Sequence, residues 1–173
     1  MFRILFICVE NCNRSQMAEA FAHIFGAGQI EAYSAGCHPA ECVHAKAIAA
    51  MAELGYDLRS HYSKGLSDLP DIVFDVAVTM GCEGQSLVLN ARCYEDWDIP
   101  CPKEMSPEQF RSVRDLIGSR VKDLLARVAN LNEKTMERFA SSSVRDRPRC
   151  VPEDPASCGN RSSQSFTGTD RPH

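Results

Sequence analysis

The sequence has no excess of positive charge and no long apolar segment. Its 173 residues include 19 Lys and Arg against 23 Asp and Glu, for a net charge of −4. This charge gives no electrostatic reason to expect binding to nucleic acid or to a membrane surface. The apolar start, Met1–Val9, is too short to span a bilayer and lacks the small-residue cleavage site of a secretory signal. We therefore expect a cytoplasmic protein with no nucleic-acid or membrane partner.

Close clusters of metal ligands are also missing, although cysteine is abundant. Of the nine cysteines, the closely spaced pairs are Cys8 with Cys12 and Cys37 with Cys42. No group of histidines completes a tetrahedral set with them, so we expect no metal site and no other cofactor. An odd cysteine count without an export signal argues against a fixed disulfide framework. Catalytic or exchangeable thiols explain the composition better, with Cys37 and Cys42 interpreted as incidental loop thiols.

Apolar runs alternate with helical patterns along the chain. Four runs have the composition of buried parallel strands: Phe2–Val9, Ile30–Ala35, Val73–Met80 and the short Cys93–Trp97. Apolar residues at helical spacing lie between and after them, near Ser15–Phe25, near Ala45–Leu54 with Leu54 facing inward, and over Pro107–Val128. This alternation predicts an α/β fold, a three-layer sandwich in which a central four-stranded parallel sheet carries helices on both faces.

The composition changes near the end of the chain. From about Ala140 onward the sequence is rich in Ser, Arg and Pro, and Phe166 is its one large apolar residue. Such a segment cannot bury enough apolar surface to offset the entropy lost on ordering. We therefore expect one domain over residues 1–138 and a disordered tail over residues 139–173.

The segment Cys8–Ser15 joins the first predicted strand to the first predicted helix, with the spacing Cys-x5-Arg-Ser. In a parallel sheet, the carboxyl end of a central strand is where ligands bind. Backbone N–H groups of the loop and of the helix start can form a nest for an anion. The planar guanidinium of Arg14 can hold two oxygens of a tetrahedral anion. The predicted oxyanion-binding residues are Val9, Glu10, Asn11, Cys12, Asn13 and Arg14.

Cys8 is the predicted nucleophile of this loop. The positive end of a helix and the neighbouring Arg14 favour the thiolate over the thiol, and a thiolate beneath a bound oxyanion is placed for in-line attack. Ser15 can donate its hydroxyl to that thiolate, and Asn11 tolerates the left-handed backbone that a tight loop needs. Glu10 must point outward to avoid repelling an anion. The alternative, a buried core cysteine beside a surface arginine, leaves the polar loop unexplained.

The loop and the residues after it, Gln16-Met17-Ala18-Glu19-Ala20, resemble the low-molecular-weight tyrosine phosphatase family, and specifically its thioredoxin-type arsenate reductase branch. Similar motifs follow at Tyr33-Ser34-Ala35-Gly36, Thr79-Met80-Gly81-Cys82, Glu95-Asp96-Trp97 and Phe110–Asp115. The likeness covers about residues 3–130. In the phosphatase branch Arg-Ser is typically followed by Pro-Ile, whereas this chain has Gln16-Met17, which favours the reductase branch. The resemblance implies the strand order 2-1-3-4.

The resemblance also implies a redox relay. Cys8 would attack arsenate, Cys82 would attack Cys8 and release arsenite, and a third thiol would attack Cys82. The third cysteine of the family lies four residues on, where this sequence has Ser86, so Cys93 and Cys101 are the candidates. The implied partners are an arsenate or phosphate oxyanion and a reductant, either thioredoxin or a small thiol with glutaredoxin. A monomer is expected.

Two further substitutions depart from the pattern of the family, and the second bears on the choice of reaction. Asn13 stands where the family usually has a cysteine, with Cys12 one position earlier. Cys101 stands at the place of the family's general-acid aspartate, and loss of a positioned acid slows the expulsion of a phenolate by about 10²–10⁴-fold. We therefore expect phosphatase activity to suffer more than arsenate reduction. The alternatives are a phosphotyrosine phosphatase that acts through a phosphoenzyme on the same nucleophile, and a non-catalytic oxyanion-binding protein.

Overall fold

All four strands of the sheet are parallel, so their carboxyl ends lie at the same edge. The computed structural model describes residues 1–82 and 89–134, with side chains as far as Ala129. Its four strands lie in the order β2-β1-β3-β4, and they are β1 (Phe2–Cys8), β2 (Ile30–Gly36), β3 (Phe74–Met80) and β4 (Ala91–Asp96). The register sets Cys8 beside Gly36 on one side and Met80 on the other. The predicted parallel sheet and its strand order are confirmed.

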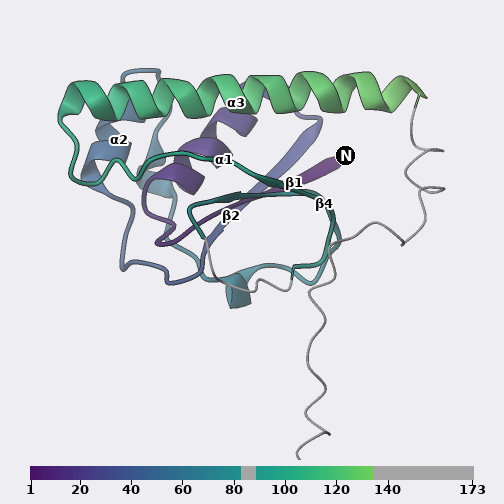
Figure 1. Cartoon of the computed structure of the whole chain (residues 1–173), viewed down its shortest axis with the longest axis horizontal. Coiled ribbons are helices and arrows are strands. Elements are labelled where there is room, and N and C mark those ends of the chain that lie inside the picture. The colour runs from purple at the N-terminus through teal and green to yellow at the C-terminus, as the bar shows by residue number, and fades with distance from the viewer. Residues whose placement is uncertain (83–88, 135–173) are drawn as a thin grey trace, which may run out of the picture. The chain divides into compact units, whose positions relative to one another are not determined.

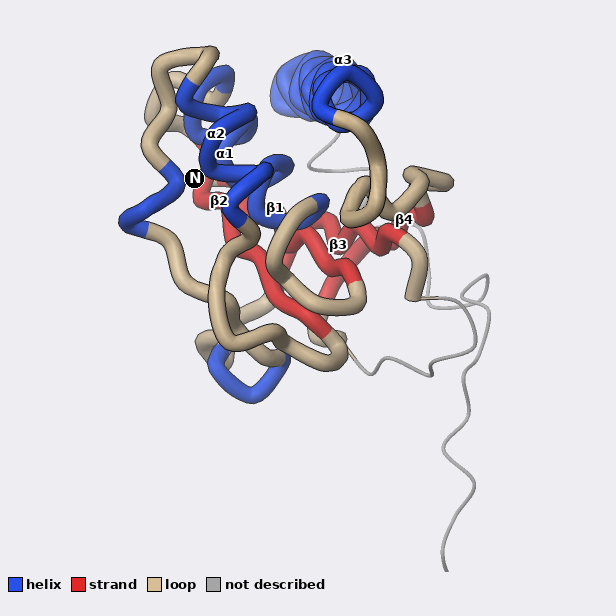
Figure 2. The backbone as a smooth tube through the Cα atoms, turned by 90° about the vertical axis from the view of Figure 1, so that its left-hand side faces the viewer, coloured by secondary structure: helices blue, strands red, loops and turns tan. Residues whose placement is uncertain are grey.

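Three α-helices pack against one face of this sheet (Figures 1 and 2). They are α1 (Arg14–Phe25), α2 (Ala45–Ala52) and α3 (Pro107–Lys134). The long helix α3 begins at Pro107 because Ser106 and Gln109 form a capping box. The Gln109 N–H donates to Ser106 Oγ at 3.3 Å, and the Ser106 N–H donates to Gln109 Oε1 at 3.1 Å. Ile4, Phe6 and Val78 of the sheet join the helices in one core.

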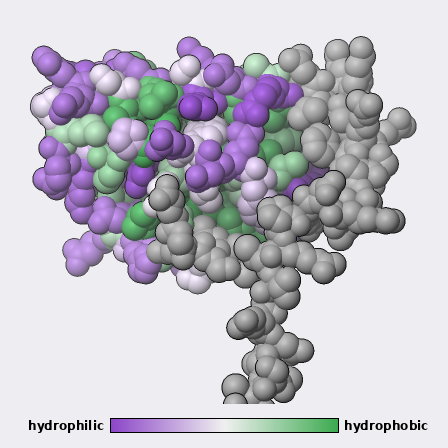
Figure 3. Space-filling view, in the orientation of Figure 1, coloured by the Kyte–Doolittle hydropathy of each residue, from purple (hydrophilic) through white to green (hydrophobic). Residues whose placement is uncertain are grey.

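The opposite face of the sheet has a thinner cover. Its buried residues include Leu5, Ile7 and Ala77, packed against side chains of the segment that contains the 3₁₀ turn η2 (Leu66–Asp68). The other 3₁₀ turn, η1 (Leu58–Ser60), contacts α2. Within residues 1–82 and 89–134, the helical cover is therefore uneven, with three α-helices on one face and one 3₁₀ turn on the other. Hydrophilic residues are interspersed with small apolar patches on the surface in view (Figure 3).

One inward residue of the second helix is predicted wrongly. Helix α2 ends at Ala52, and Leu54 is 46% exposed. The chain turns away at Gly55, which has a φ of +77°. The apolar spacing that predicts this helix therefore extends beyond the residue where the helix ends. The domain end at residue 138 and the tail 139–173 lie outside the described residues. In the described ranges, no helix is long and apolar enough to cross a membrane.

Candidate active site

The loop after β1 turns at Asn11, whose backbone has a φ of +48°. Its buried side chain forms four hydrogen bonds, which fix this turn. The Nδ2 group donates to Ser15 Oγ at 2.8 Å and to Ser34 Oγ at 2.9 Å. The Oδ1 atom accepts from Gln16 Nε2 at 2.8 Å and from the backbone N–H of Lys64 at 2.7 Å. One amide thus holds the loop to α1, β2 and the segment before η2.

The residues that bind the Asn11 side chain are held in turn by further polar contacts. Ser34 donates its hydroxyl to Glu19. His61 lies between Gln16 and Tyr56, with Nδ1 at 3.0 Å from Gln16 Oε1 and Nε2 at 3.0 Å from the Tyr56 hydroxyl. Burial lowers the pKa of His61, with the neighbouring Glu19 acting in the opposite direction. The imidazole is therefore neutral near pH 7, with Nδ1–H donating to Gln16 and Nε2 accepting from Tyr56.

Two glycines let neighbouring strand ends approach the loop closely. A Cβ on Gly36, at the end of β2, would lie 2.8 Å from Asn11 N and 2.9 Å from Val9 O. Gly81, just after β3, has a φ of +72°, and a Cβ there would lie 2.6 Å from Arg14 Nη1. A side chain at either place would displace the loop or its arginine.

Cys8, the predicted nucleophile, is the last residue of β1, and Arg14 is the first residue of α1. Cys8 Sγ is 3.0 Å from Ser15 Oγ, and Cys8 is only 2% exposed. The side chain of Asn13 does not cap α1, so the first N–H groups of the helix are left for a ligand. Arg14 donates from Nη1 to the Ile99 carbonyl at 2.9 Å and forms no ion pair with a carboxylate in the described ranges. Its charge is therefore available to an anion.

These groups share one open pocket of about 250 Å³, lined by Cys8, Val9, Glu10, Cys12, Asn13, Arg14, Cys101 and Lys103. The charge of Glu10 is balanced by Lys103, whose Nζ lies 2.9 Å from Glu10 Oε1. This ion pair holds the pKa of Glu10 below its usual value. Burial and the adjacent Glu10 raise the pKa of Cys12 to about 12, so Cys12 stays a thiol. Of the predicted oxyanion-binding residues, Asn11 alone is not part of the lining and acts as the support described above.

Cys82 lies on the other face of the sheet, next to Cys37, which is interpreted from the sequence as an incidental loop thiol. Cys82 follows β3 and Cys37 follows β2, and their Sγ atoms are 3.2 Å apart. Both pack with Leu5 and Ile7, whereas Cys8 belongs to the core under the α-helices. Burial and the contact with Cys37 raise the pKa of Cys82 to about 12. In this position Cys82 is therefore a thiol.

The two predicted third thiols occupy different places. Cys101 is exposed at the oxyanion pocket. Cys93 lies within β4, paired in register with Val76, and packs against the α-helical core. The position of Ser86 lies outside the described residues.

Three contributors to the site were missed from the sequence, namely Cys37, Lys103 and the Ile99 carbonyl. A usable signal existed for Cys37. It lies two residues after the end of a predicted strand, and the ends of parallel strands meet at one edge of a sheet.

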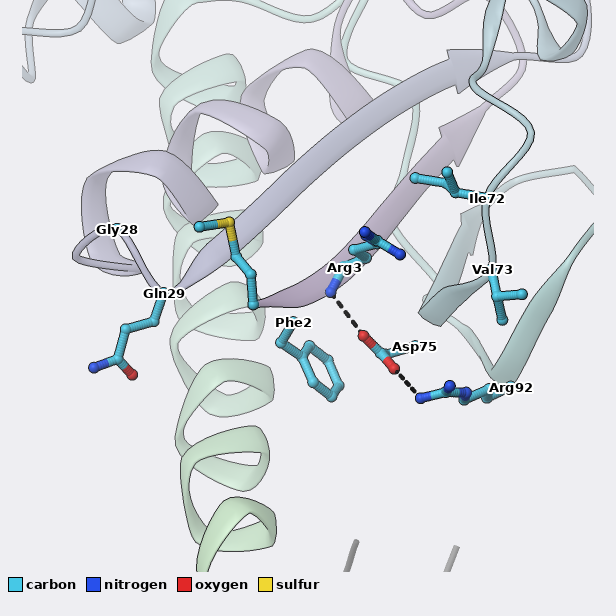
Figure 4. Close-up of a pocket in the computed structure, with 9 residues that line it drawn as sticks. Phe2, Arg3, Gly28, Gln29, Ile72, Val73, Asp75 and Arg92 are labelled. Carbon is cyan, nitrogen blue, oxygen red and sulfur yellow. Dashed lines mark hydrogen bonds and ion pairs between the residues drawn. The ribbon is translucent and has the colours of Figure 1, made fainter. Parts of the chain in front are cut away.

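A second, larger hollow lies at the opposite edge, at the amino ends of the strands (Figure 4). Its volume is about 830 Å³, and no cysteine or histidine is among its lining residues. Its arginines are paired with carboxylates, since Arg3 Nε lies 2.8 Å from Glu31 Oε2 and Arg92 Nη1 lies 2.7 Å from Asp75 Oδ1. The backbone N–H of Arg3 also donates to Asp75 Oδ2 at 2.9 Å. Among the described residues, no thiol or imidazole lines this hollow, and each arginine side chain on its lining is paired with a carboxylate.

Cys8 and Arg14 flank the loop between a central strand and a helix, which is the arrangement of a cysteine-dependent, oxyanion-binding α/β enzyme. Residues 3–136 match the family model of the low molecular weight phosphotyrosine protein phosphatases, so the chain belongs to this family. The chain is 36% identical over 133 residues to the glutaredoxin arsenate reductase of Synechocystis sp., covering 75% of this chain and 100% of that protein. It is 31% identical over 128 residues to arsenate reductase 1 of Staphylococcus epidermidis, covering 72% of this chain and 96% of that protein.

Solved structures give the same result. An arsenate reductase in its phosphate-binding state matches with a TM-score of 0.67 and 36% identity, covering 73% of this chain and 98% of that chain. A thioredoxin-dependent arsenate reductase of Corynebacterium glutamicum matches with a TM-score of 0.62 and 26% identity, covering 75% of this chain and 63% of that chain. The family expected from the loop motif is confirmed.

Proposed function

We propose that the chain is an arsenate reductase that converts arsenate to arsenite with electrons from thiols. The observation that carries this proposal is an oxyanion pocket with Cys8 and Arg14 on its lining, and a second thiol, Cys82, after the adjacent strand. The arsenate reductases among its relatives support the reaction. We propose further that the protein acts as a cytoplasmic monomer, with thioredoxin or glutaredoxin and a small thiol as the reductant.

Arsenate binds against the start of α1 in this proposal. The fork of Arg14 holds two of its oxygens, and the uncapped N–H groups of the loop and helix hold the others. Lys103 keeps the carboxylate of Glu10 from repelling the anion. The Ser15 hydroxyl, 3.0 Å from Cys8 Sγ, donates to the thiolate and aims it at the bound arsenic.

The reaction takes two steps. Cys8 thiolate attacks arsenic, a sulfur–arsenic bond forms, and one arsenate oxygen takes protons from solvent and leaves as water. Cys82 then loses its proton to solvent and attacks Cys8 Sγ. The new disulfide takes the place of the sulfur–arsenic bond, whose electron pair stays on arsenic, so As(V) becomes As(III) and leaves as arsenite. Cys82 must leave its buried position for this step, and Gly81 gives the backbone beside it the freedom to turn.

The pocket is poorly equipped for phosphate ester hydrolysis. Among the described residues, Glu10 is the one carboxyl group on its lining, and the ion pair with Lys103 keeps that group ionised. An ionised carboxylate cannot protonate a leaving alkoxide or phenolate. Cys101 occupies the rim where the family places its acid. We therefore expect weak phosphatase activity.

Replacement of Cys82 tests the proposal. Arsenite release is measured with NADPH, thioredoxin and thioredoxin reductase, and in parallel with glutathione and glutaredoxin. Wild-type protein should turn over with one of these systems, and Cys8→Ser should be inactive in both. Cys82→Ser should lose arsenate reduction while keeping whatever cleavage of p-nitrophenyl phosphate the wild type has. Cys42→Ser, at an exposed thiol, is the control. Undiminished arsenate reduction by Cys82→Ser would contradict the two-thiol reaction.

A further inference from the structure

We propose that Cys37 is the thiol that resolves the Cys8–Cys82 disulfide, so that each turnover ends with a Cys37–Cys82 disulfide. This inference rests on the proposed reductase function. It assigns the third thiol to Cys37, which follows β2, and not to Cys93 or Cys101, which the sequence suggested.

The first argument is proximity. The sulfurs of Cys37 and Cys82 are 3.2 Å apart, and a disulfide requires about 2.0 Å. The two thiols follow β2 and β3, the strands on either side of β1, which ends at Cys8. Three neighbouring strand ends thus each supply one thiol. A Cys82 side chain that returns from Cys8 to its resting place arrives at Cys37.

The second argument is exposure. Cys8 and Cys82 are 2% and 8% exposed, whereas Cys37 is only partly buried. The backbone of Cys37 is held in place, since its N–H donates to the Cys8 carbonyl at 3.2 Å. Oxidising equivalents therefore pass from a buried thiol to a more accessible one, where an external thiol can attack.

The third argument concerns which sulfur leaves. Cys37 thiolate, after losing its proton to solvent, attacks Cys82 Sγ, and the bond between Cys82 and Cys8 breaks. Cys8 leaves as a thiolate that the Ser15 hydroxyl, the Arg14 charge and the start of α1 stabilise. The better-stabilised thiolate is the better leaving group. Cys82 has no comparable support in its resting position, where burial beside Cys37 raises the pKa of its thiol to about 12.

The exchange keeps the number of electrons constant, with one disulfide replacing another and Cys8 regenerated. A dithiol reductant such as thioredoxin then supplies two electrons to the Cys37–Cys82 disulfide. The other candidate thiols are less well placed. Cys93 packs against the opposite face of the sheet from Cys82. Cys101 shares the oxyanion pocket with Cys8, and Cys82 is not part of that lining.

Disulfide mapping after a single turnover tests the assignment. Reduced protein is mixed with arsenate without reductant, quenched with an alkylating agent and mapped by mass spectrometry, while released arsenite is measured. We expect wild-type protein to release one arsenite per chain and to contain Cys37–Cys82. Cys37→Ser should release the same single arsenite and trap Cys8–Cys82. This release also shows that the variant is folded, and Cys37→Ala provides a second variant for the same comparison.

Steady-state turnover with thioredoxin completes the test. Cys37→Ser should lose multiple turnover, and the exposed Cys42→Ser should retain the wild-type rate. A wild-type map that shows Cys8–Cys82, or a disulfide containing Cys93 or Cys101, would overturn the role of Cys37, as would full turnover by Cys37→Ser. These results would leave the reductase function intact. The absence of arsenite from wild-type protein would instead overturn the proposed function itself.

Discussion

The two edges of the sheet both carry arginines beside a hollow, but they differ in what those arginines contact. At the carboxyl edge, Arg14 donates to a carbonyl and has no carboxylate partner among the described residues. At the amino edge, Arg3 and Arg92 form ion pairs with Glu31 and Asp75. The amino-edge hollow has the larger volume, about 830 Å³ against about 250 Å³. In the proposed function, it is the buried Arg14 beside the free N–H groups of α1 that makes the smaller pocket the oxyanion site, and not the size of the cavity.

The strongest test of this difference replaces one arginine at each edge. Arg14→Lys keeps the charge but loses the planar fork, so kcat/KM for arsenate should fall by about 10²–10³-fold, as for loss of a group that stabilises transition-state charge. Arg92→Lys should change kcat/KM very little. Both constants come from arsenite release at varied arsenate. Comparable losses in the two variants would remove the distinction between the edges.

Glycine replacements compare how tightly each edge is packed. Gly81 and Gly28 have φ values of +72° and +76°, but a Cβ meets Arg14 at the first and open space at the second. Each Ala substitution should lower the free energy of unfolding by about 1–2 kcal/mol, because both force an L-residue into a left-handed conformation. Gly81→Ala should also reduce kcat/KM by up to about 10²-fold through displacement of Arg14. Urea denaturation and steady-state kinetics separate the two effects, and an active Gly81→Ala would refute the contact.

Removal of a cation from one ion pair at each edge should give a smaller effect. Lys103→Ala leaves the Glu10 carboxylate unbalanced on the oxyanion pocket, whereas Arg92→Ala leaves Asp75 unbalanced far from it. Because the Lys103–Glu10 pair is partly exposed, we expect the inhibition constant for phosphate to weaken by only about three- to tenfold. Phosphate competition against arsenate measures this constant. A double variant with Glu10→Gln should restore it, and failure to do so would exclude charge repulsion as the cause.

The smallest expected effect is a dependence of folding stability on pH, caused by His61 near the loop at the carboxyl edge. Folding lowers the pKa of His61 from 6.5, so below that pH the unfolded chain binds a proton that the folded chain does not. Stability is therefore complete above pH 6.5 and declines as the pH falls towards the folded-state value. Glu19, Lys64 and His23 also act on this imidazole. Denaturation between about pH 7 and pH 5 should show a smaller decline in His61→Gln, and identical slopes would exclude His61 as the cause.

The oxyanion loop could be predicted because its parts are contiguous in the chain. Cys8, Arg14 and the intervening N–H groups occupy one segment, and the apolar run before it places that segment at a strand end. The family resemblance supplied the strand order. Local patterns predict the ends of elements less accurately. The apolar spacing of α2 includes Leu54, although the helix ends at Ala52.

Contacts between distant segments could not be predicted in this way. Cys37 and Cys82 are 45 positions apart, and Glu10 and Lys103 are 93 apart. Each pair depends on the sheet register and on the direction in which a loop leaves its strand. Neither is specified by spacing or composition. The sequence could place Cys37 at the same edge of the sheet as Cys82, but the contact between the two sulfurs required the folded structure.

The turn at Asn11 limits which amino acids position 11 can accept during evolution or design. Glycine would adopt the φ of +48° with ease but would remove all four hydrogen bonds of the side chain. Alanine would lose the bonds and resist the backbone conformation. Aspartate could accept as Asn11 does, but it could not donate to the two serines and would add a negative charge beneath an anion. Each substitution fails for a different reason, so a library randomised at this position should return asparagine almost alone.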